Sequence, residues 1–430
     1  MSSLKRTLGL PMLCFYGTGV IVGAGIYSII GKAAAQTGET LWLGFLLAGV
    51  SALLTALSYA ELSTMFPKAG AEFVYLREAF KNQKWIGSTA GIAMAFSGAA
   101  TAATVALAFS GYLNQFFELP QSLVALVVLI VFTGISIIGI RASSWVTVIS
   151  TLIEVGGLIF IIYLGMTSDK FGQALSAKPH LGTLSGSALI IFSFFGFENI
   201  VNLSEEVKEP ERNLPRAILI SVILAIILYV FVSISALTLL SPEKLAESDA
   251  PLLSVARVIS EKYARILGAV ALFSTANTAL ISLIGASRIL YGMGKAKALP
   301  QVAARVLPKR KTPWIASLVV LTAAALLLPL GKLETVASVS SFATMTAFFS
   351  VNIALIVLRY SQSSKKRAFR VPLSIGKFPI LPLFGALISL VLLTQFESKV
   401  YLIGVTLILI SSLGFMWHTR KTKFKGPSSF

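Results

Sequence analysis

Three glutamates lie inside long apolar runs, where an ionisable side chain is costly to bury. Glu154 and Glu198 stand in the middle of such runs, and Glu61 stands near the end of another. A carboxyl group in apolar surroundings favours its neutral, protonated form, and acids within membrane helices often carry protons or line ion pathways. The sequence therefore indicates Glu154 and Glu198 as candidate proton carriers.

Glycines interrupt two of these apolar runs. The first run contains four glycines between Gly17 and Gly25, and another run places Gly196 just before Glu198 and Asn199. Glycine is a poor helix former and lets a ligand approach the backbone closely. Membrane transporters bind substrates where helices are broken, because a break frees backbone N–H and C=O groups. Close helix packing is the alternative for the first cluster alone, and the pairing of two breaks favours a binding site.

The elements that position these residues are membrane helices. The chain has 430 residues, of which 56% are hydrophobic and 13% are charged, about half the charged share of a soluble domain. This composition excludes secreted disulfide scaffolds, disordered chains and soluble nucleic-acid binders. Apolar runs of this length span a bilayer as helices, and we expect about twelve of them. Their predicted ranges are 8–31, 40–64, 87–116, 121–140, 145–166, 186–203, 215–240, 262–290, 313–330, 334–358, 379–396 and 399–418.

Positive charges predict the orientation of these helices. An even number of spans puts both termini on one side, and about three quarters of the 36 Lys and Arg residues fall on that side. Such a bias marks the cytoplasmic face, so we expect a multi-pass protein of the cell membrane with both termini in the cytoplasm. The net charge of +18 is explained by short basic loops that face anionic lipid headgroups, among them the loop 360–377. A nucleic-acid partner is not needed to explain it.

Several short motifs occur in a fixed order from the first span to the end of the eighth. They occupy residues 23–27, 58–62, 66–70, 75–80, 195–199, 205–215 and 286–291. This ordered set resembles the motifs of the amino acid–polyamine–organocation superfamily of permeases. The resemblance implies a single all-α membrane transport domain of the LeuT type. Its two inverted five-helix repeats would cover about 8–166 and 186–358, with broken first and sixth helices, and two more helices would follow at about 379–418.

The resemblance also implies that the two breaks hold the backbone groups of an amino acid. The amides of Ala24, Gly25 and Ile26 would bind its carboxylate at the positive end of a helix dipole. The carbonyl groups that would accept from its ammonium group lie near Ile21, Phe192 and Phe195. The family often has serine at the position of Ala24, so this chain would bind the carboxylate with backbone amides alone.

Gates and pocket walls follow from the same resemblance. Phe192 or Phe195 would close over the substrate, with ordinary packing as the alternative for each. Asn277 would line the pocket together with small residues of the third span, which favours neutral amino acids; cationic amino acids or polyamines are the alternative. Glu61 and Arg77 would contribute to ion pairs of an inner gate, against the alternative of a solvated loop. Further charged residues of this region are Glu78, Glu205, Glu206, Lys208, Glu211, Arg212 and Arg288.

Glu154 and Glu198 compare differently with the residues that the family has at these positions. Glu198 matches a family acid associated with protons, whereas Glu154 replaces a lysine that many members carry. At that position an acid would carry a proton, bind sodium, pair with an amine on the substrate or form a structural hydrogen bond. We favour proton coupling. Residues of the eighth span that would supply ligands near Glu154 are Ser274, Thr275 and Asn277.

Enzyme chemistry has no support in the sequence. The two histidines are far apart, which excludes a histidine metal cluster, and no glycine-rich phosphate loop or nucleophile elbow is present. We therefore predict a secondary active transporter without a cofactor or metal, whose partners are an amino acid, protons and the lipid bilayer. Its one cysteine, Cys14, lies within a span, so no disulfide-linked subunit is expected.

Overall fold

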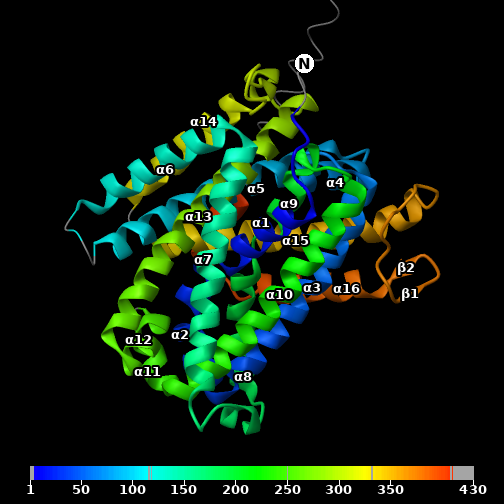
Figure 1. Ribbon diagram of the computed structural model, residues 1–430. Coiled ribbons are helices and arrows are strands. Elements are labelled where there is room, and N and C mark those ends of the chain that lie inside the picture. The colour runs from blue at the N-terminus through cyan, green and yellow to red at the C-terminus, as the bar shows by residue number, and fades with distance from the viewer. Residues whose placement is uncertain are drawn as a thin grey trace, which may run out of the picture.

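The computed structural model describes residues 4–114, 117, 119–248, 250–330, 333–406 and 409. Most of these residues are helical and very few lie in strands, so the prediction of an all-α membrane protein is confirmed (Figure 1). The longer helices are α1 (Leu10–Val22), α2 (Ala24–Thr37), α3 (Leu41–Met65), α5 (Lys84–Leu113), α6 (Gln121–Ile138), α7 (Ile140–Met166), α10 (Pro210–Leu239), α13 (Glu261–Lys295), α14 (Trp314–Leu327), α15 (Leu333–Ser361) and α16 (Ile380–Leu393).

Short elements connect or interrupt the long helices. The short α-helices are α4 (Ala71–Ala79), α8 (Leu181–Ile190), α9 (Glu198–Asn202), α11 (Pro242–Ala246) and α12 (Pro251–Ile259). The 3-10 turns are η1 (Gly38–Thr40), η2 (Gln173–Ser176), η3 (Ile191–Phe194), η4 (Ser204–Glu206), η5 (Gln301–Ala304) and η6 (Leu328–Leu330). Two antiparallel strands, β1 (Ser374–Ile375) and β2 (Phe378–Pro379), form a small hairpin in which Ser374 pairs with Pro379.

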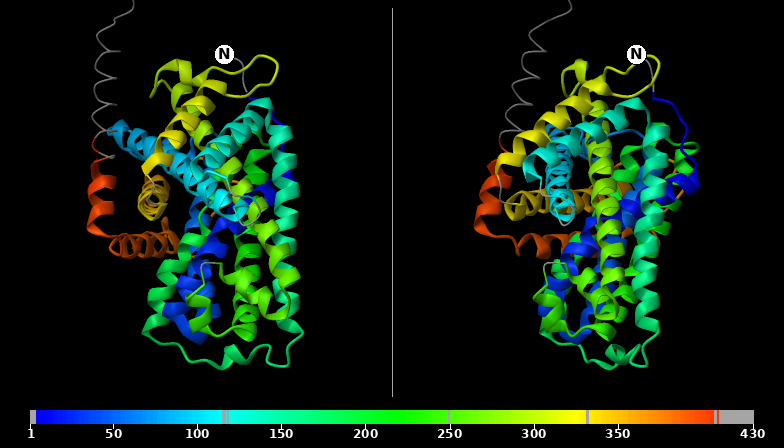
Figure 2. Two further views of the ribbon diagram at one scale, coloured as in Figure 1. Left: turned by 90° about the vertical axis from the view of Figure 1, so that its left-hand side faces the viewer. Right: turned by 60° about the vertical axis from the view of Figure 1, so that its left-hand side comes forward.

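Nine helices in the described part of the chain are long and apolar enough to cross a membrane, or ten if one bent pair counts as a single span. That pair, Ile380–Leu393 and Ser398–Thr406, is bent by 115° and lies on the outside of the bundle (Figure 2). It corresponds to the predicted spans 379–396 and 399–418, although 407–408 and 410–418 lie outside the described residues. The predicted span 313–330 is the shorter helix α14, followed by the 3-10 turn η6.

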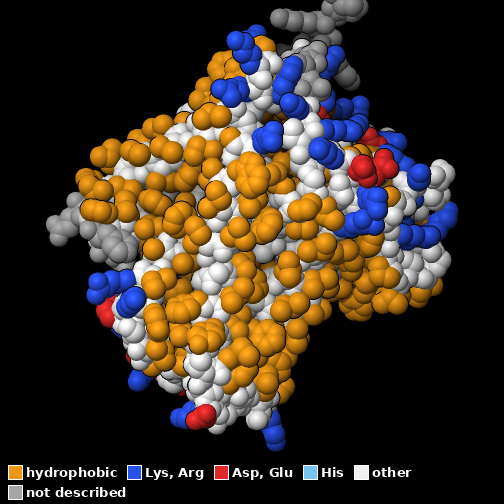
Figure 3. Space-filling model, in the orientation of Figure 1, with side chains coloured by type: hydrophobic (Ala, Val, Ile, Leu, Met, Phe, Trp, Pro, Cys, Tyr) orange, Lys and Arg blue, Asp and Glu red, His pale blue; other side chains and the backbone are white. Residues whose placement is uncertain are grey.

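The outer surface carries a broad apolar region (Figure 3). On α6, for example, Leu123, Val127 and Ile130 are about half exposed and are spaced three or four residues apart, which puts them on one helix face. An exposed apolar area of this extent marks contact with a membrane. Most of the Lys and Arg side chains in this view lie around the end near the N-terminus and on the side of the β-hairpin. The protein is therefore a multi-pass membrane protein.

The first helix lies inside the bundle and not on its surface. α1 packs against α7, α10 and α13, and its second half is buried. Small residues permit this close packing: a Cβ atom at Gly17 would lie 2.4 Å from the side chains of Ile200 and Ser221. The glycine-rich first span is therefore held between helices that are far apart in the sequence.

Candidate functional site

The first span is broken at Gly23. Its φ of −43° and ψ of −142° end α1, and α2 starts at the next residue. The backbone N–H of Gly23 still donates to the Gly19 carbonyl, 3.0 Å away. The three amides predicted to bind a carboxylate, those of Ala24, Gly25 and Ile26, open α2, and the first N–H groups of a helix have no acceptor within that helix.

The predicted sixth span is broken as well. It consists of α8, the 3-10 turn η3 and, after a gap, α9. Gly196 lies in this gap with φ +127°, a conformation that side chains with a Cβ atom rarely adopt. Its amide donates to Oε2 of Glu198 at 2.8 Å, and Glu198 is only 5% exposed. The acid predicted from the sequence therefore holds the broken turn with its own carboxylate.

The two breaks lie against each other. A Cβ atom at Gly25 would be 2.9 Å from Cα of Ser193, and one at Gly196 would be 3.0 Å from the Val20 carbonyl oxygen. The Tyr229 hydroxyl on α10 lies 2.6 Å from the Ile21 carbonyl oxygen and 3.1 Å from that of Ser193. One tyrosine therefore bridges the ends of both broken helices, and it occupies the Ile21 carbonyl that the sequence assigns to a ligand. Nothing in the sequence around Tyr229 indicated this contact.

Glu154 lies in a small polar group beside the first break. Its Oε1 accepts from the Asn277 side-chain amide at 3.0 Å, and that amide is also 3.2 Å from Oγ1 of Thr151. The Thr151 hydroxyl donates to the Phe15 carbonyl of α1 at 3.1 Å. Glu154 is fully buried, and no ion pair involves it among the described residues. Asn277, predicted as a pocket wall, thus belongs to the surroundings of this acid.

Several buried polar atoms near the breaks have no hydrogen-bond partner among the described residues. They are Thr18 Oγ1, Tyr27 OH, Glu154 Oε2, Ser193 Oγ, Ser274 Oγ and Asn277 Oδ1. Most buried polar groups in proteins are paired, so a concentration of unpaired ones is typical of a site that binds a ligand or ion. These atoms come from α1, α2, η3, α7 and α13, which are the helices that carry or surround the two breaks.

The four phenylalanines of the sixth span separate into two kinds. Phe194 and Phe197 are fully buried and pack on tyrosines, with ring centroids 5.1 Å from Tyr229 and 5.5 Å from Tyr59 respectively. Phe192 and Phe195 are only partly buried, and their own centroids are 5.3 Å apart. The two residues predicted as gates are thus the two that are only partly buried, although the ring of Phe195 also packs on Phe348, with centroids 5.5 Å apart.

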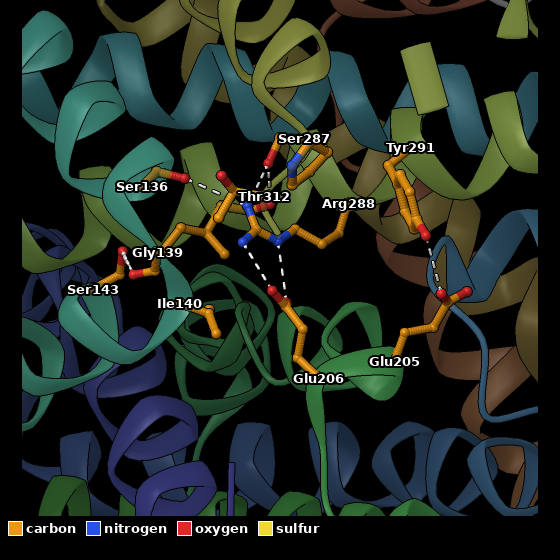
Figure 4. A network of polar contacts seen from close by, with 12 residues as sticks. Ser136, Gly139, Ile140, Ser143, Glu205, Glu206, Ser287, Arg288, Tyr291 and Thr312 are labelled. Atoms are coloured by element: carbon orange, nitrogen blue, oxygen red, sulfur yellow. Dashed lines mark hydrogen bonds and ion pairs between the residues drawn. The ribbon is translucent and has the colours of Figure 1, made fainter. Parts of the chain in front are cut away.

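A buried ion pair joins the end of the sixth span to α13. Arg288 and Glu206 are both fully buried, with distances of 3.1 Å from Nη2 to Oε1 and 3.2 Å from Nε to Oε2 (Figure 4). The same guanidinium donates to the Ser287 hydroxyl at 2.9 Å and lies 3.4 Å from that of Ser136. Glu205 pairs with Lys295 at 2.7 Å in a more exposed position. Two of the acids assigned to the inner gate therefore bind α13.

The segment before α1 binds the same turn through its backbone. The amides of Thr7 and Leu8 donate to the Glu206 carbonyl at 2.8 and 3.0 Å, and the Lys208 amide donates to the Leu8 carbonyl at 2.8 Å. Leu8 is buried, so the segment before α1 is fixed to the turn that follows the sixth span. The contact ties the residues before the first broken helix to those after the second.

Glu61 forms a second buried ionic cluster, with partners that the sequence did not suggest. Its carboxylate binds the guanidinium of Arg359, lies 3.0 Å from Nε of Arg367 and accepts from the Val371 amide at 2.7 Å. Arg359 lies in the last turn of α15, and Arg367 lies in the loop that the sequence assigned to membrane-surface charge alone. The only sequence signal for this role is the unusual density of arginine after an apolar helix.

Arg77 and Glu72 on α4 have surroundings that the sequence did not predict. Arg77 has no acidic partner among the described residues; it donates to the Ala296 carbonyl at 3.2 Å and stacks over Phe73. Glu72, which the sequence analysis passed over, is fully buried on α4 and accepts from the Tyr59 hydroxyl at 3.1 Å. Burial raises the pKa of Glu72 to about 8, and the nearby Glu198 adds to this increase.

Comparison with known proteins agrees with this architecture. Residues 8–416 match the family model described as amino acid permease. The branched-chain amino acid permease BcaP of Bacillus subtilis is 27% identical, over 97% of this chain and 94% of that protein. The methylthioribose transporter of the same species is 26% identical over the same shares. Cationic amino acid transporter 4 of the mouse is 31% identical over 84% of this chain and 61% of its own length.

The match to the family model covers nearly all of the described helices, including both breaks. The resemblance drawn from the ordered motifs is therefore confirmed, and the chain is a transporter and not an enzyme. This protein belongs to the amino acid permease family of the amino acid–polyamine–organocation superfamily.

Proposed function

We propose that this chain is a secondary active transporter that moves amino acids across the cell membrane by alternating access, with protons as the coupling ion and neutral amino acids as the favoured substrates. The observation that carries the proposal is the contact between the two helix breaks. Backbone donors at the start of α2 lie next to the backbone acceptors of Ile21 and Ser193. An amino acid requires both kinds of group, donors for its carboxylate and acceptors for its ammonium group.

Binding of the substrate would involve Tyr229. The amides of Ala24, Gly25 and Ile26 would receive the carboxylate, and the ammonium group would donate to the Ile21 carbonyl in place of the tyrosine hydroxyl. Carbonyl groups of Phe192 and Phe195 would contribute, and the rings of these residues would close over the substrate. Replacement of one buried donor by another leaves no acceptor unpaired, so the exchange is energetically feasible.

Proton coupling would involve Glu154 and Glu198. Glu154 has one neutral amide partner and one unpaired oxygen, in a fully buried position. A carboxylate without a counter-charge is costly there, which favours proton uptake when the site is closed to water. Glu198 binds the broken turn through Gly196, so a change in its charge would act directly on the substrate site.

Alternating access requires that one face closes while the other opens. We infer that the Arg288–Glu206 pair and the Glu61 cluster close one face, which positive charge predicts to be cytoplasmic together with both termini. The moving parts would be the two inverted repeats, 8–166 and 186–358, with 379–418 as an added pair of helices. Arg77 would anchor α4 near this gate through the Ala296 carbonyl.

Transport or exchange of cationic amino acids or polyamines is the second candidate. Relatives named cationic amino acid transporters match 83–84% of this chain. The unpaired Oε2 of Glu154 offers a partner for a substrate amine. Among the described residues around the two helix breaks, the other carboxylate is that of Glu198, and it already accepts from Gly196. Neutral substrates therefore remain the favoured class.

Uptake of radiolabelled amino acids and polyamines into proteoliposomes tests the proposal, with and without an inward proton gradient. We expect uptake of a neutral amino acid that the gradient stimulates. Uptake that ignores the gradient but needs substrate inside would contradict proton coupling and establish exchange. Uptake of arginine, lysine or polyamines alone would establish the second candidate.

A further inference from the structure

A strongly basic cavity lies between α15 and the hairpin that precedes α16. Its volume is about 410 Å³, and we call it the basic pocket. The residues that line it are Arg359, Ser363, Lys365, Arg367, Arg370 and Lys377. Five of these six side chains are positively charged and none is acidic, so positive charge is concentrated around the cavity.

The inner wall of the pocket is rigid. Arg359 is 2% exposed and is held by Glu61, by the Val371 carbonyl at 3.2 Å and by the Ser374 hydroxyl at 3.3 Å. Arg367 donates to the Leu358 carbonyl at 3.1 Å. The buried Nε atom of Arg359 has no hydrogen-bond partner among the described residues. These contacts hold the Arg359 guanidinium in place at the inner wall of the pocket.

Acids of the described residues balance only part of the positive charge of the pocket. Glu61 lies behind the wall and serves both Arg359 and Arg367. Arg370 and Lys377 are exposed and form no ion pair with an acid of the described residues. Burial lowers the pKa of Lys365, and Lys68, Lys81 and Arg367 lower it further, whereas Glu78 opposes the change. The cations therefore repel one another, and a bound anion would relieve this repulsion.

We propose that the basic pocket binds a phosphate group. Arginine forks match phosphate oxygens in geometry as well as charge, and Ser363 adds a hydroxyl donor. The phosphate belongs either to the headgroup of an anionic lipid or to a soluble phosphate compound, since most of the lining residues belong to the loop 360–377, which the sequence predicts to face lipid headgroups. A bound phosphate would join the hairpin to the end of α15 and, through Arg359, to Glu61 on α3.

Two binding measurements on the purified full-length protein separate these sources. In the first, thermal unfolding is followed in detergent with sodium pyrophosphate and with sodium chloride of equal ionic strength. In the second, native mass spectrometry counts phosphatidylglycerol and phosphatidylcholine molecules that stay bound. The pocket variant is Arg370→Gln with Lys377→Gln, because these side chains are exposed and form no ion pair with an acid of the described residues. The matched control is Lys309→Gln with Arg310→Gln, an exposed basic pair outside the pocket.

The pocket variant should bind the phosphate probe about tenfold more weakly, whereas the control should change by less than about twofold. A loss for pyrophosphate identifies a soluble ligand, and a loss for phosphatidylglycerol identifies a lipid headgroup; each supports the pocket. Equal losses in the two variants would show general surface attraction and overturn the proposal. Wild-type protein that binds neither probe better than its chloride or phosphatidylcholine reference would overturn it as well.

Discussion

Replacement of Arg288 by methionine should strongly destabilise the protein. The guanidinium is fully buried and makes two bonds to Glu206, so its removal leaves a carboxylate buried without a counter-charge. Breaking a buried pair from one side costs about 3–5 kcal/mol. We expect a loss of this size in the free energy of unfolding of the Arg288→Met variant. Reversible unfolding in mixed micelles, with increasing amounts of sodium dodecyl sulfate, measures it.

A double variant separates the pair from general packing damage. Arg288→Met combined with Glu206→Met removes both charges, and the methionine side chains fill much of the same volume. The double variant should therefore regain most of the lost stability. Lys295→Gln is the matched control, because its partner Glu205 forms a more exposed pair worth at most about 1 kcal/mol. A double variant that loses as much as the two single variants together would refute the reasoning, as would a loss in Arg288→Met no larger than in the control.

Three further predictions concern the breaks and the buried acids. Gly25→Leu should abolish substrate binding but not membrane insertion, because a Cβ atom there meets the Ser193 backbone at 2.9 Å; equilibrium binding checks this, and retained affinity would exclude the site. Glu154→Gln and Glu198→Gln should each alter the pH dependence of uptake, and unchanged profiles in both would remove the proton hypothesis. Wild-type stability should fall as pH rises from about 4.5 through about 8, since the folded protein retains the Glu72 proton longer than the unfolded chain. Glu72→Gln should reduce this fall, by up to about 1.4 kcal/mol per pH unit, when unfolding is measured between pH 5 and pH 9; an unchanged slope would contradict the assignment.

The sequence was informative where chemistry is local. Glycine in a long apolar run predicts a weak point in a helix, and both predicted breaks occur, at Gly23 and at Gly196. The helix ranges could be predicted from hydropathy because each membrane helix satisfies its own backbone hydrogen bonds, so its extent depends on the local sequence. Hydropathy does not give the angle between helices, so the 115° bend after α16 was not predicted.

Contacts between distant segments were less accessible from the sequence. Glu61 and Arg359 are 298 residues apart, and no local pattern links them. The same holds for Tyr229, which reaches Ile21 over 208 residues and has the sequence context of an ordinary core tyrosine. Glu61 was identified through a motif, whereas its partner Arg367, in the loop after α15, was taken for surface charge. Pairing of buried charges depends on the tertiary fold, which a single sequence does not specify.

Counterflow in proteoliposomes tests the central claim most directly. Vesicles are loaded with the unlabelled amino acid that the uptake panel identifies, diluted into a trace of the same amino acid in labelled form, and followed over time without any ion gradient. A carrier with one site that opens to either face predicts transient accumulation of label above its equilibrium level, and Gly25→Leu should abolish it. Label that only equilibrates, at the same rate with and without substrate inside, would contradict alternating access at the two helix breaks.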